Sequence, residues 1–238
     1  MPAPIVIADS ITRVGPEATG AVVVNASHGG VYAAYLAAKL QAAAAIFNDA
    51  SVGRDGADLM ARGRISHVNA AAAALGCAPG QRTPEAAALL AAAPLSEQDP
   101  PAQAEARHAI AGVAGWLLDS NGVVRPDDAG TIVVTGSHGG LLGGRPATAI
   151  RVDAFAAVYN DAGGGIDDAG FSRLPALDAR AIAGATVDAF SARIGDARST
   201  YDDGVLSRVN QVAARHGAAA GMRCTEFVAL MERARRKR

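Results

Sequence analysis

Short apolar runs alternate with alanine-rich segments along this chain. Residues 22–25 and 131–135 are β-branched runs that lead into glycine-containing turns, a pattern typical of buried parallel strands. Helix-forming sequence follows each run: residues 31–41 in the first case, and a weaker segment after Arg145 and Pro146 in the second. Each region therefore predicts a strand, a turn and a helix, in that order.

A second pair of apolar runs, residues 44–47 and 156–159, ends at an Asn-Asp pair. Added to the preceding strand and helix, each run completes a βαβ unit, which implies a parallel sheet with a right-handed crossover. Residues 65–75 and 205–216 have helical spacing, and each segment is followed by glycine, a common stop residue. These patterns together predict an α/β fold.

The chain also repeats its own sequence. Residues 22–30 (VVVNASHGG) recur 110 positions later as residues 132–140 (IVVTGSHGG), and Asn-Asp-Ala at 48–50 recurs as 160–162. Because further blocks recur in the same order, we predict an internal duplication of parallel βαβ units related by pseudo-twofold symmetry. The further blocks, at an offset of 141 positions, pair Ser66-x-Val68-Asn69 with Ser207-x-Val209-Asn210, and Gly80-x-Arg82-x-x-Glu85 with Gly221-x-Arg223-x-x-Glu226.

The second copy is longer than the first. Between its Asn-Asp block and its Ser-x-Val-Asn block it holds 29 more residues, roughly 165–194, and residues 184–190 within them have strand character. We therefore predict one extra strand-helix unit in the second copy. A tract with three prolines and several charges is the natural connector between the copies. The predicted limits are 1–91 for the first repeat, 92–109 for the linker and 110–238 for the second repeat.

Composition narrows the class of protein. Half of the residues are hydrophobic, only 4% are aromatic, and the formal net charge is −1. Without a basic field, the chain is not expected to bind nucleic acid. Its apolar runs are shorter than the ~20 residues of a membrane span, and no secretory signal is evident. We therefore expect a cytoplasmic protein with no membrane partner, and the alanine-rich helices favour close packing in a homo-oligomer. Cys77 and Cys224 are too few for a disulfide framework.

Polar residues follow the predicted strands in both copies. In open α/β sheets, ligands bind beyond the carboxyl ends of the strands, where the Ser-His-Gly-Gly and Asn-Asp blocks should meet. Glycines would let backbone N–H groups approach a ligand, and a helix N-terminus would favour a carboxylate or an oxyanion. The candidate catalytic residues are Ser137, His138, Asp161, Ser27, His28 and Asp49. The candidate substrate-binding residues are Gly139, Gly140, Gly29, Gly30, Asn160, Asn48, Arg82, Arg223 and Arg193.

These residue types suit acid–base or acyl-transfer chemistry. The serines could act as nucleophiles or as donors to an oxyanion, the histidines as acid/base groups, and the aspartates as orienting carboxylates. His28 could meet the other copy's site across a pseudo-twofold interface, and His138 the reverse. Arg82 and Arg223 each precede a glutamate by three residues and could clamp a carboxylate. Simpler roles compete: Ser and Asn-Asp are ordinary cap and turn residues, and the Gly-x-Arg-x-x-Glu blocks match a helix cap with an Arg–Glu pair.

One strand-turn resembles a known family. Residues 132–142 (IVVTGSHGGLL) are similar to the Gly-Ser-His-Gly strand-turn of the universal stress protein family. Because members of that family often bind ATP, the resemblance implies a nucleotide site. It covers about a dozen residues, and Gly139, Gly140, Gly143 and Gly144 do not reproduce the family's glycine spacing. The family's later Gly-Ser is not evident, and the Asn-Asp-Ala block has no place in its pattern.

Taken together, the sequence favours a small-molecule enzyme without a cofactor. It has no dinucleotide-binding or P-loop motif and no histidine pair at metal-ligand spacing, so neither a cofactor nor a metal is expected. We predict a hydrolase acting on an amide- or ester-like or carboxylate-bearing metabolite, with its site at the strand ends between the two repeats. A lyase or isomerase would use the same groups. The same features also suit a non-catalytic nucleotide- or metabolite-binding protein, or a protein whose role is assembly alone.

Overall fold

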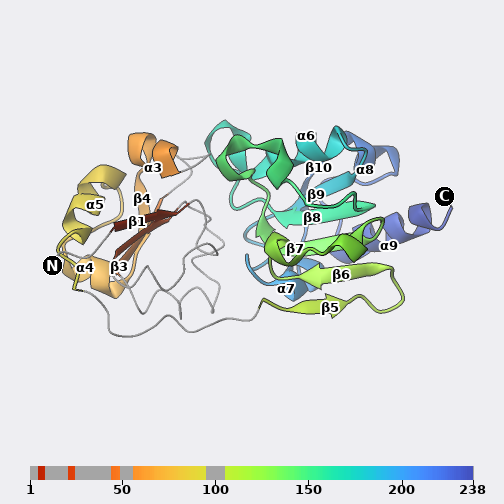
Figure 1. The fold of residues 1–238 in the computed structure, drawn as a ribbon, viewed down its shortest axis with the longest axis horizontal. Helices are drawn as coiled ribbons and strands as arrows, with labels where there is room; N and C mark the ends of the chain where they lie inside the picture. Colours follow the sequence, from red (N-terminus) through yellow and green to blue (C-terminus); the bar gives the residue numbers. More distant parts are fainter. Residues whose placement is uncertain (1–4, 9–20, 25–43, 49–55, 95–104, 238) are drawn as a thin grey trace. The chain divides into compact units, whose positions relative to one another are not determined.

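The structure is a computed structural model of the chain, and it describes residues 5–8, 21–24, 44–48, 56–94 and 105–237. The chain divides into two compact units. Unit 1 comprises Met1–Gln103 with Gly165–Asp167, and unit 2 comprises Ala104–Gly164 with Asp168–Arg238. Each unit is built on a sheet of its own (Figure 1).

A mixed six-stranded sheet forms the centre of unit 2, in the order β10-β9-β8-β7-β6-β5. Strands β6 to β9 are parallel neighbours, whereas β5 and β10 pair antiparallel at the two edges. The bounds are β5 (Arg107–Ala109), β6 (Gly115–Leu118), β7 (Ile132–His138), β8 (Ala156–Asn160), β9 (Ala183–Val187) and β10 (Leu206–Val209).

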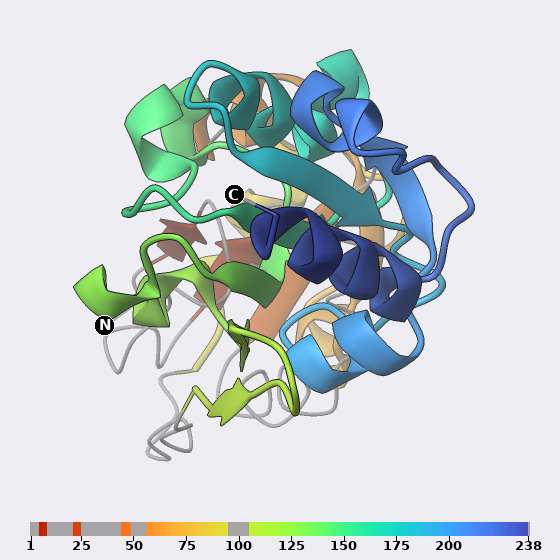
Figure 2. The ribbon, with the colours of Figure 1, turned by 90° about the vertical axis from the view of Figure 1, so that its right-hand side faces the viewer.

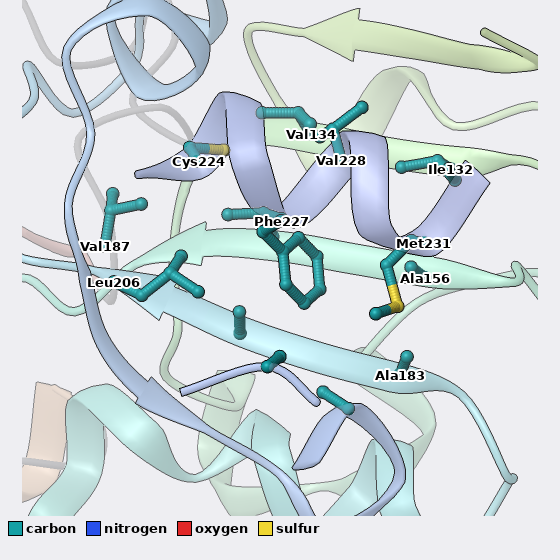
Figure 3. Packing of buried hydrophobic residues seen from close by; sticks show 14 of the residues in the cluster. Ile132, Val134, Ala156, Ala183, Val187, Leu206, Cys224, Phe227, Val228 and Met231 are labelled. Carbon is teal, nitrogen blue, oxygen red and sulfur yellow. The ribbon is translucent and has the colours of Figure 1, made fainter. Parts of the chain in front are cut away.

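One face of this sheet is covered by the C-terminal helix α9 (Cys224–Arg235), which Figure 2 shows crossing in front of the strands. Alternate strand residues point to this side, so Ile132 and Val134 of β7 share a core cluster with Phe227 and Met231 of α9. Phe227 and Met231 are both fully buried, and Figure 3 shows them directed onto the sheet. This face therefore carries the larger core cluster of unit 2.

The other face carries α6 (Arg173–Asp178). The intervening strand residues Val133 and Tyr159 pack here with Ile150 and Leu177 in a second core cluster. With helices on both faces of a largely parallel sheet, the predicted α/β fold is confirmed. Two further short helices complete the unit, α7 (Ala197–Asp202) and α8 (Gln211–Arg215).

Unit 1 contains a four-stranded sheet in the order β1-β2-β3-β4, with β4 antiparallel to β3 and the other neighbours parallel. Its bounds are β1 (Ile5–Ala8), β2 (Ala21–Val24), β3 (Ala44–Asn48) and β4 (Ile65–Val68), with α3 (Gly56–Arg62), α4 (Ala70–Ala74) and α5 (Thr83–Leu90). Leu59, Ile65 and Leu90 are among the residues of its buried core. Within the described ranges of both units, no helix has the length and apolar character to cross a bilayer.

The predicted strands are present as β2, β3, β7, β8 and β9, but the four predicted helices need correction or lie outside the described residues. Residues 65–75 and 205–216 each begin as a strand and become helical only after Asn69 or Asn210. Helical spacing misleads here because a four-residue strand runs into a short helix without a gap. The helix predicted at 31–41 falls outside the described ranges.

No α-helix lies between β7 and β8. The segment after it forms two short 3₁₀ turns, Leu142–Gly144 and Pro146–Thr148. The cause is local: Gly143 and Gly144 have φ values of 56° and 68°, in the left-handed region that an α-helix cannot use. The Ser-His-Gly-Gly turn of unit 2 therefore has no helix N-terminus behind it, contrary to the prediction.

The repeated C-terminal blocks adopt the same local structure in both units. Asn69 and Asn210 each cap a helix by accepting the N–H of the residue three positions on, at 2.9 Å. Gly76 and Gly217 follow those helices at φ values of 89° and 91°, where glycine is favoured. The strands that precede the caps, β4 and β10, are both antiparallel edges.

The strands that pair with β4 and β10, namely β3 and β9, also have matching registers. In unit 1, Asn48 of β3 is opposite Ile65, and in unit 2, Val187 of β9 is opposite Leu206. Both ladders carry a register shift near the same point. By its pairing, β3 thus corresponds to β9, although its Asn-Asp-Ala sequence matches the end of β8.

Candidate functional site

The candidate site lies at the carboxyl ends of β7 and β8. His138 is the last residue of β7, Asn160 is the last of β8, and the two are partners in the parallel ladder. Ser137 and Asp161 are their immediate chain neighbours. The structure thus brings these four predicted residues of unit 2 together at the carboxyl ends of two central strands.

Two glycines in this segment are required by close backbone approach. A Cβ atom on Gly136 would lie 2.6 Å from the backbone nitrogen of Asp196, and one on Gly139 would lie 2.2 Å from the carbonyl oxygen of Gly170. Both distances are shorter than any normal contact of a Cβ atom. Gly139 was predicted to let the backbone approach a ligand; among the described residues, the close neighbour at this position is the protein's own backbone.

The amides of Gly139 and Gly140 are both engaged within the protein. Gly139 donates its N–H to the carbonyl oxygen of Asn160 at 2.6 Å, and Gly140 donates to Nδ1 of His138 at 3.1 Å. An oxyanion cradle needs amides that point at the ligand. In this structure these two amides instead fix the turn and the imidazole.

The hydrogen bond from Gly140 also sets the tautomer of His138. Because Nδ1 accepts, the neutral ring carries its proton on Nε2. Burial, and the positive charge of Arg173, lower the pKa of His138 to about 3, against the opposing effect of the bond from Gly140. His138 is therefore a neutral hydrogen-bond donor near pH 7.

Arg173 is a site residue that the sequence reasoning missed. Its side chain is 2% exposed and donates from Nε to the carbonyl oxygen of His138 at 3.1 Å. Nη1 donates to the carbonyl oxygens of Thr148 and Ala149, and the guanidinium lies 4.8 Å from the ring centroid of Tyr159. Nothing in the run Phe-Ser-Arg-Leu-Pro distinguishes this arginine from a surface one.

Ser137 is half-buried, and its Oγ accepts the N–H of Asn121 at 2.8 Å. In the described part of the chain, no hydrogen bond joins Ser137 to His138. The serine hydroxyl keeps its proton available for donation, because the bond to Asn121 uses only a lone pair. This arrangement suits a donor to substrate better than a nucleophile with an adjacent base.

Asn160 and Asp161 are both buried. Asn160 donates from Nδ2 to the carbonyl oxygen of Ala192 at 3.0 Å and accepts the N–H of Ala162 at 2.8 Å. Asp161 Oδ1 accepts two backbone N–H groups, from Gly163 and Ala189, each at 2.9 Å. Among the described residues, no group donates to Oδ2 of Asp161. A buried carboxylate oxygen without a donor is unusual in a folded protein.

The predicted arginines are mostly committed elsewhere. Arg193 forms an exposed ion pair with Asp196 at 2.9 Å. Arg223 lies at the start of α9, where its N–H donates to Glu226 and its Nη2 donates to the carbonyl oxygen of Asp202. Arg82 stands in the same relation to Glu85 at the start of α5. The simpler interpretation of these two blocks as helix starts describes the geometry.

The remaining predicted residues belong to unit 1. Asn48 ends β3, and only its backbone position is described. Ser27, His28, Gly29, Gly30 and Asp49 lie outside the described residues. In the described ranges, no group of three or more His, Cys, Asp or Glu side chains is placed to hold a metal ion. Both cysteines are buried, and burial raises the pKa of Cys224 to about 12.

The fold and the position of the candidate site define an α/β protein. Its polar side chains are gathered at the carboxyl ends of adjacent parallel strands. Comparison with known proteins adds no relative: no family model, no curated protein and no solved structure matches this chain.

Proposed function

We propose that the chain is a small-molecule enzyme whose site is the carboxyl edge of β7 and β8. The observation that carries the proposal is the buried carboxylate of Asp161, whose Oδ2 has no donor among the described residues. Its other oxygen is held by two amides, so the group is fixed in position. Such a carboxylate is a suitable general base.

The reaction class is hydrolysis of an amide- or ester-like bond in a carboxylate-bearing metabolite. Asp161 takes a proton from water, and the resulting hydroxide adds to the substrate carbonyl. Ser137 Oγ–H and His138 Nε2–H donate to the oxyanion that forms. The C–N or C–O bond then breaks, and the leaving group takes up the proton from Asp161. His138 acts as a donor rather than a base, because its Nδ1 is occupied and its pKa is low.

The test is turnover of an ester and amide panel by the full-length chain and its variants. Asp161→Asn keeps an acceptor for Gly163 and Ala189, and should lower kcat by about 10²–10⁴-fold. His138→Gln should lower it by about 10–10³-fold. Asp188→Asn is the matched control: it changes an aspartate beyond the neighbouring strand β9 and should leave kcat unchanged. Full turnover by a folded Asp161→Asn protein would exclude the proposal.

A second candidate is a non-catalytic metabolite- or nucleotide-binding protein. It is favoured by the two donors at the site, Ser137 Oγ–H and His138 Nε2–H, because a binding site needs donors but no catalytic base. Thermal-shift screening with ATP, AMP and dicarboxylates separates the two. A shift with nucleotides, together with no turnover on the panel, would favour this candidate. A lyase or isomerase would use the same base and donors.

We also propose that the chain is an internal duplication, with copies at 1–91 and 110–238 joined by 92–109 and related by a pseudo-twofold axis. The support is the shared cap at Asn69 and Asn210, and the shared register of β3–β4 and β9–β10. The two copies should superpose on these elements by a rotation of about 180°, which crystallography of the chain tests. Assembly as a homo-oligomer stays a prediction, which light scattering on the purified chain tests.

A further inference from the structure

A mainly apolar groove of about 600 Å³ opens on unit 2 beside α6. Leu141, Pro146, Pro175 and Ala176 are among its apolar lining residues, and the buried Ile150 lies at its base. Its volume falls within the range of about 300–1,000 Å³ that is usual for small-molecule sites. The proposed hydrolytic chemistry uses none of the residues that line it.

Three polar side chains line the groove, and two of them are already committed. Ser172 Oγ accepts the N–H of Leu141 and donates to the carbonyl oxygen of Ala169, both at 2.8 Å. Arg180 forms an ion pair with Asp153 at 2.7 Å and donates to the carbonyl oxygens of Ile150 and Val152. These two groups have little capacity left for a ligand.

Arg151 is different. It lines the groove, it is exposed, and among the described residues its guanidinium has no hydrogen-bond or ion-pair partner. A guanidinium presents a planar fork of N–H groups that matches a carboxylate. The groove thus combines an apolar lining with one uncommitted cation.

A second positive charge lies just behind the lining. Arg173 is bonded to the carbonyl oxygens of Thr148 and Ala149, which immediately precede the lining residue Ile150. In the described part of the chain no carboxylate pairs with Arg173, so its buried charge is not neutralised. The one carboxylate that pairs with a groove arginine, Asp153, is taken by Arg180. The local charge therefore favours an anion.

We infer that this groove binds a small amphipathic monocarboxylate. The hydrocarbon part lies against Leu141, Pro175 and Ala176, and the carboxylate pairs with Arg151. The apolar contacts require a chain of several carbons, and the cation discriminates against uncharged molecules of the same shape.

The test is calorimetric titration of the full-length chain with octanoate, 1-octanol and acetate. Octanoate should bind saturably, and octanol and acetate should each bind at least about tenfold more weakly. Equal affinity for octanol and octanoate would overturn the inference, as would the absence of saturable octanoate binding.

Two variants and a control locate the site. Arg151→Gln should weaken octanoate binding by about tenfold while leaving the melting temperature unchanged, because the residue is exposed. Ala176→Trp should fill the groove and abolish binding. Arg215→Gln, an exposed arginine at the end of α8, should bind octanoate as the wild type does. Unchanged affinity in Arg151→Gln, or in a folded Ala176→Trp protein, would contradict the assignment.

Discussion

The guanidinium of Arg173 donates from Nε to the backbone carbonyl oxygen of His138 at 3.1 Å. A buried cation thus holds the last residue of β7, and its charge adds to the effect of burial in lowering the pKa of the His138 imidazole to about 3. The Arg173 side chain therefore connects α6 with the end of β7 and also influences the protonation state of the His138 imidazole.

The coupling predicts a pH dependence of stability. The pKa of His138 is about 3 in the folded chain, against about 6.5 in an unfolded one. Between these values the unfolded state binds the extra proton, so the stabilisation is complete above pH 6.5 and is lost as the pH falls toward 3. The loss should be at most about 1.4 kcal/mol per pH unit. Urea unfolding at pH 7, 6, 5 and 4 measures it.

The matched comparison is His138→Gln against His216→Gln. His138→Gln should flatten the decline in unfolding free energy between pH 6.5 and 4, whereas His216→Gln should retain it. Identical pH profiles for wild type and His138→Gln would show that the fold does not hold this half-buried imidazole in its neutral form.

Removing the charge of Arg173 tests its structural role. Arg173→Met keeps a long side chain but removes the Arg173 donor from the carbonyl oxygens of His138, Thr148 and Ala149, of which Ala149 retains the Tyr159 hydroxyl. Each buried oxygen left without a donor costs about 1–3 kcal/mol. We expect a fall in unfolding free energy of at least about 2 kcal/mol in denaturant titrations. Arg215→Met, at an exposed position, should change it by less than about 0.5 kcal/mol. A stable Arg173→Met protein would contradict the assignment.

The buried ion pair of Arg107 with Asp128 makes a separate prediction. Their atoms Nη2 and Oδ1 are 2.8 Å apart, and the Asp128 side chain is 0% exposed. Burial alone would raise the pKa of Asp128, but hydrogen bonds and charge from Arg107 and Arg125 lower it overall. Asp128→Asn leaves the cation unpaired and should cost about 3–5 kcal/mol. Asp127→Asn, at an exposed neighbour, should cost less than about 0.5 kcal/mol; equal effects would contradict the account.

Backbone strain next to the candidate base gives a stabilising prediction. Ala162 follows Asp161 with a φ of 55°, a conformation that costs an alanine about 1 kcal/mol and a glycine almost nothing. Ala162→Gly should therefore raise the melting temperature or leave it unchanged. Ala179→Gly, at a right-handed position with φ −60°, should lower it. The same sign for both variants would contradict this reasoning.

Strand positions could be predicted from the sequence because buried parallel strands leave short β-branched runs that end at turns. The edge strands β4 and β10 were missed because they run straight into short helices at Asn69 and Asn210, so the combined pattern has helical spacing. The sequence around Asn48 resembles that around Asn160 at the end of β8, which suggested that β3 corresponds to β8. By its pairing, β3 corresponds to β9 instead. Strand pairing is a long-range property that no local pattern contains.

Part of the candidate site could be predicted from local sequence patterns. The repeated Ser-His-Gly-Gly block indicated Ser137 and His138, and the strand assignment placed them with Asp161 at the carboxyl ends of neighbouring strands. The engaged amides of Gly139 and Gly140 and the buried charge of Arg173 depend on segments distant in the chain. No spacing in the sequence signals them.

The most direct test of the central claim is a nitrogen-15 NMR titration of the His138 imidazole, assigned with His138→Gln and recorded with and without the best substrate of the panel. The account predicts a neutral ring with its proton on Nε2 from pH 7 down to pH 4, and a shift of the Nε2 resonance when substrate binds. Protonation near pH 6.5, a proton on Nδ1, or no response to a bound substrate would contradict it.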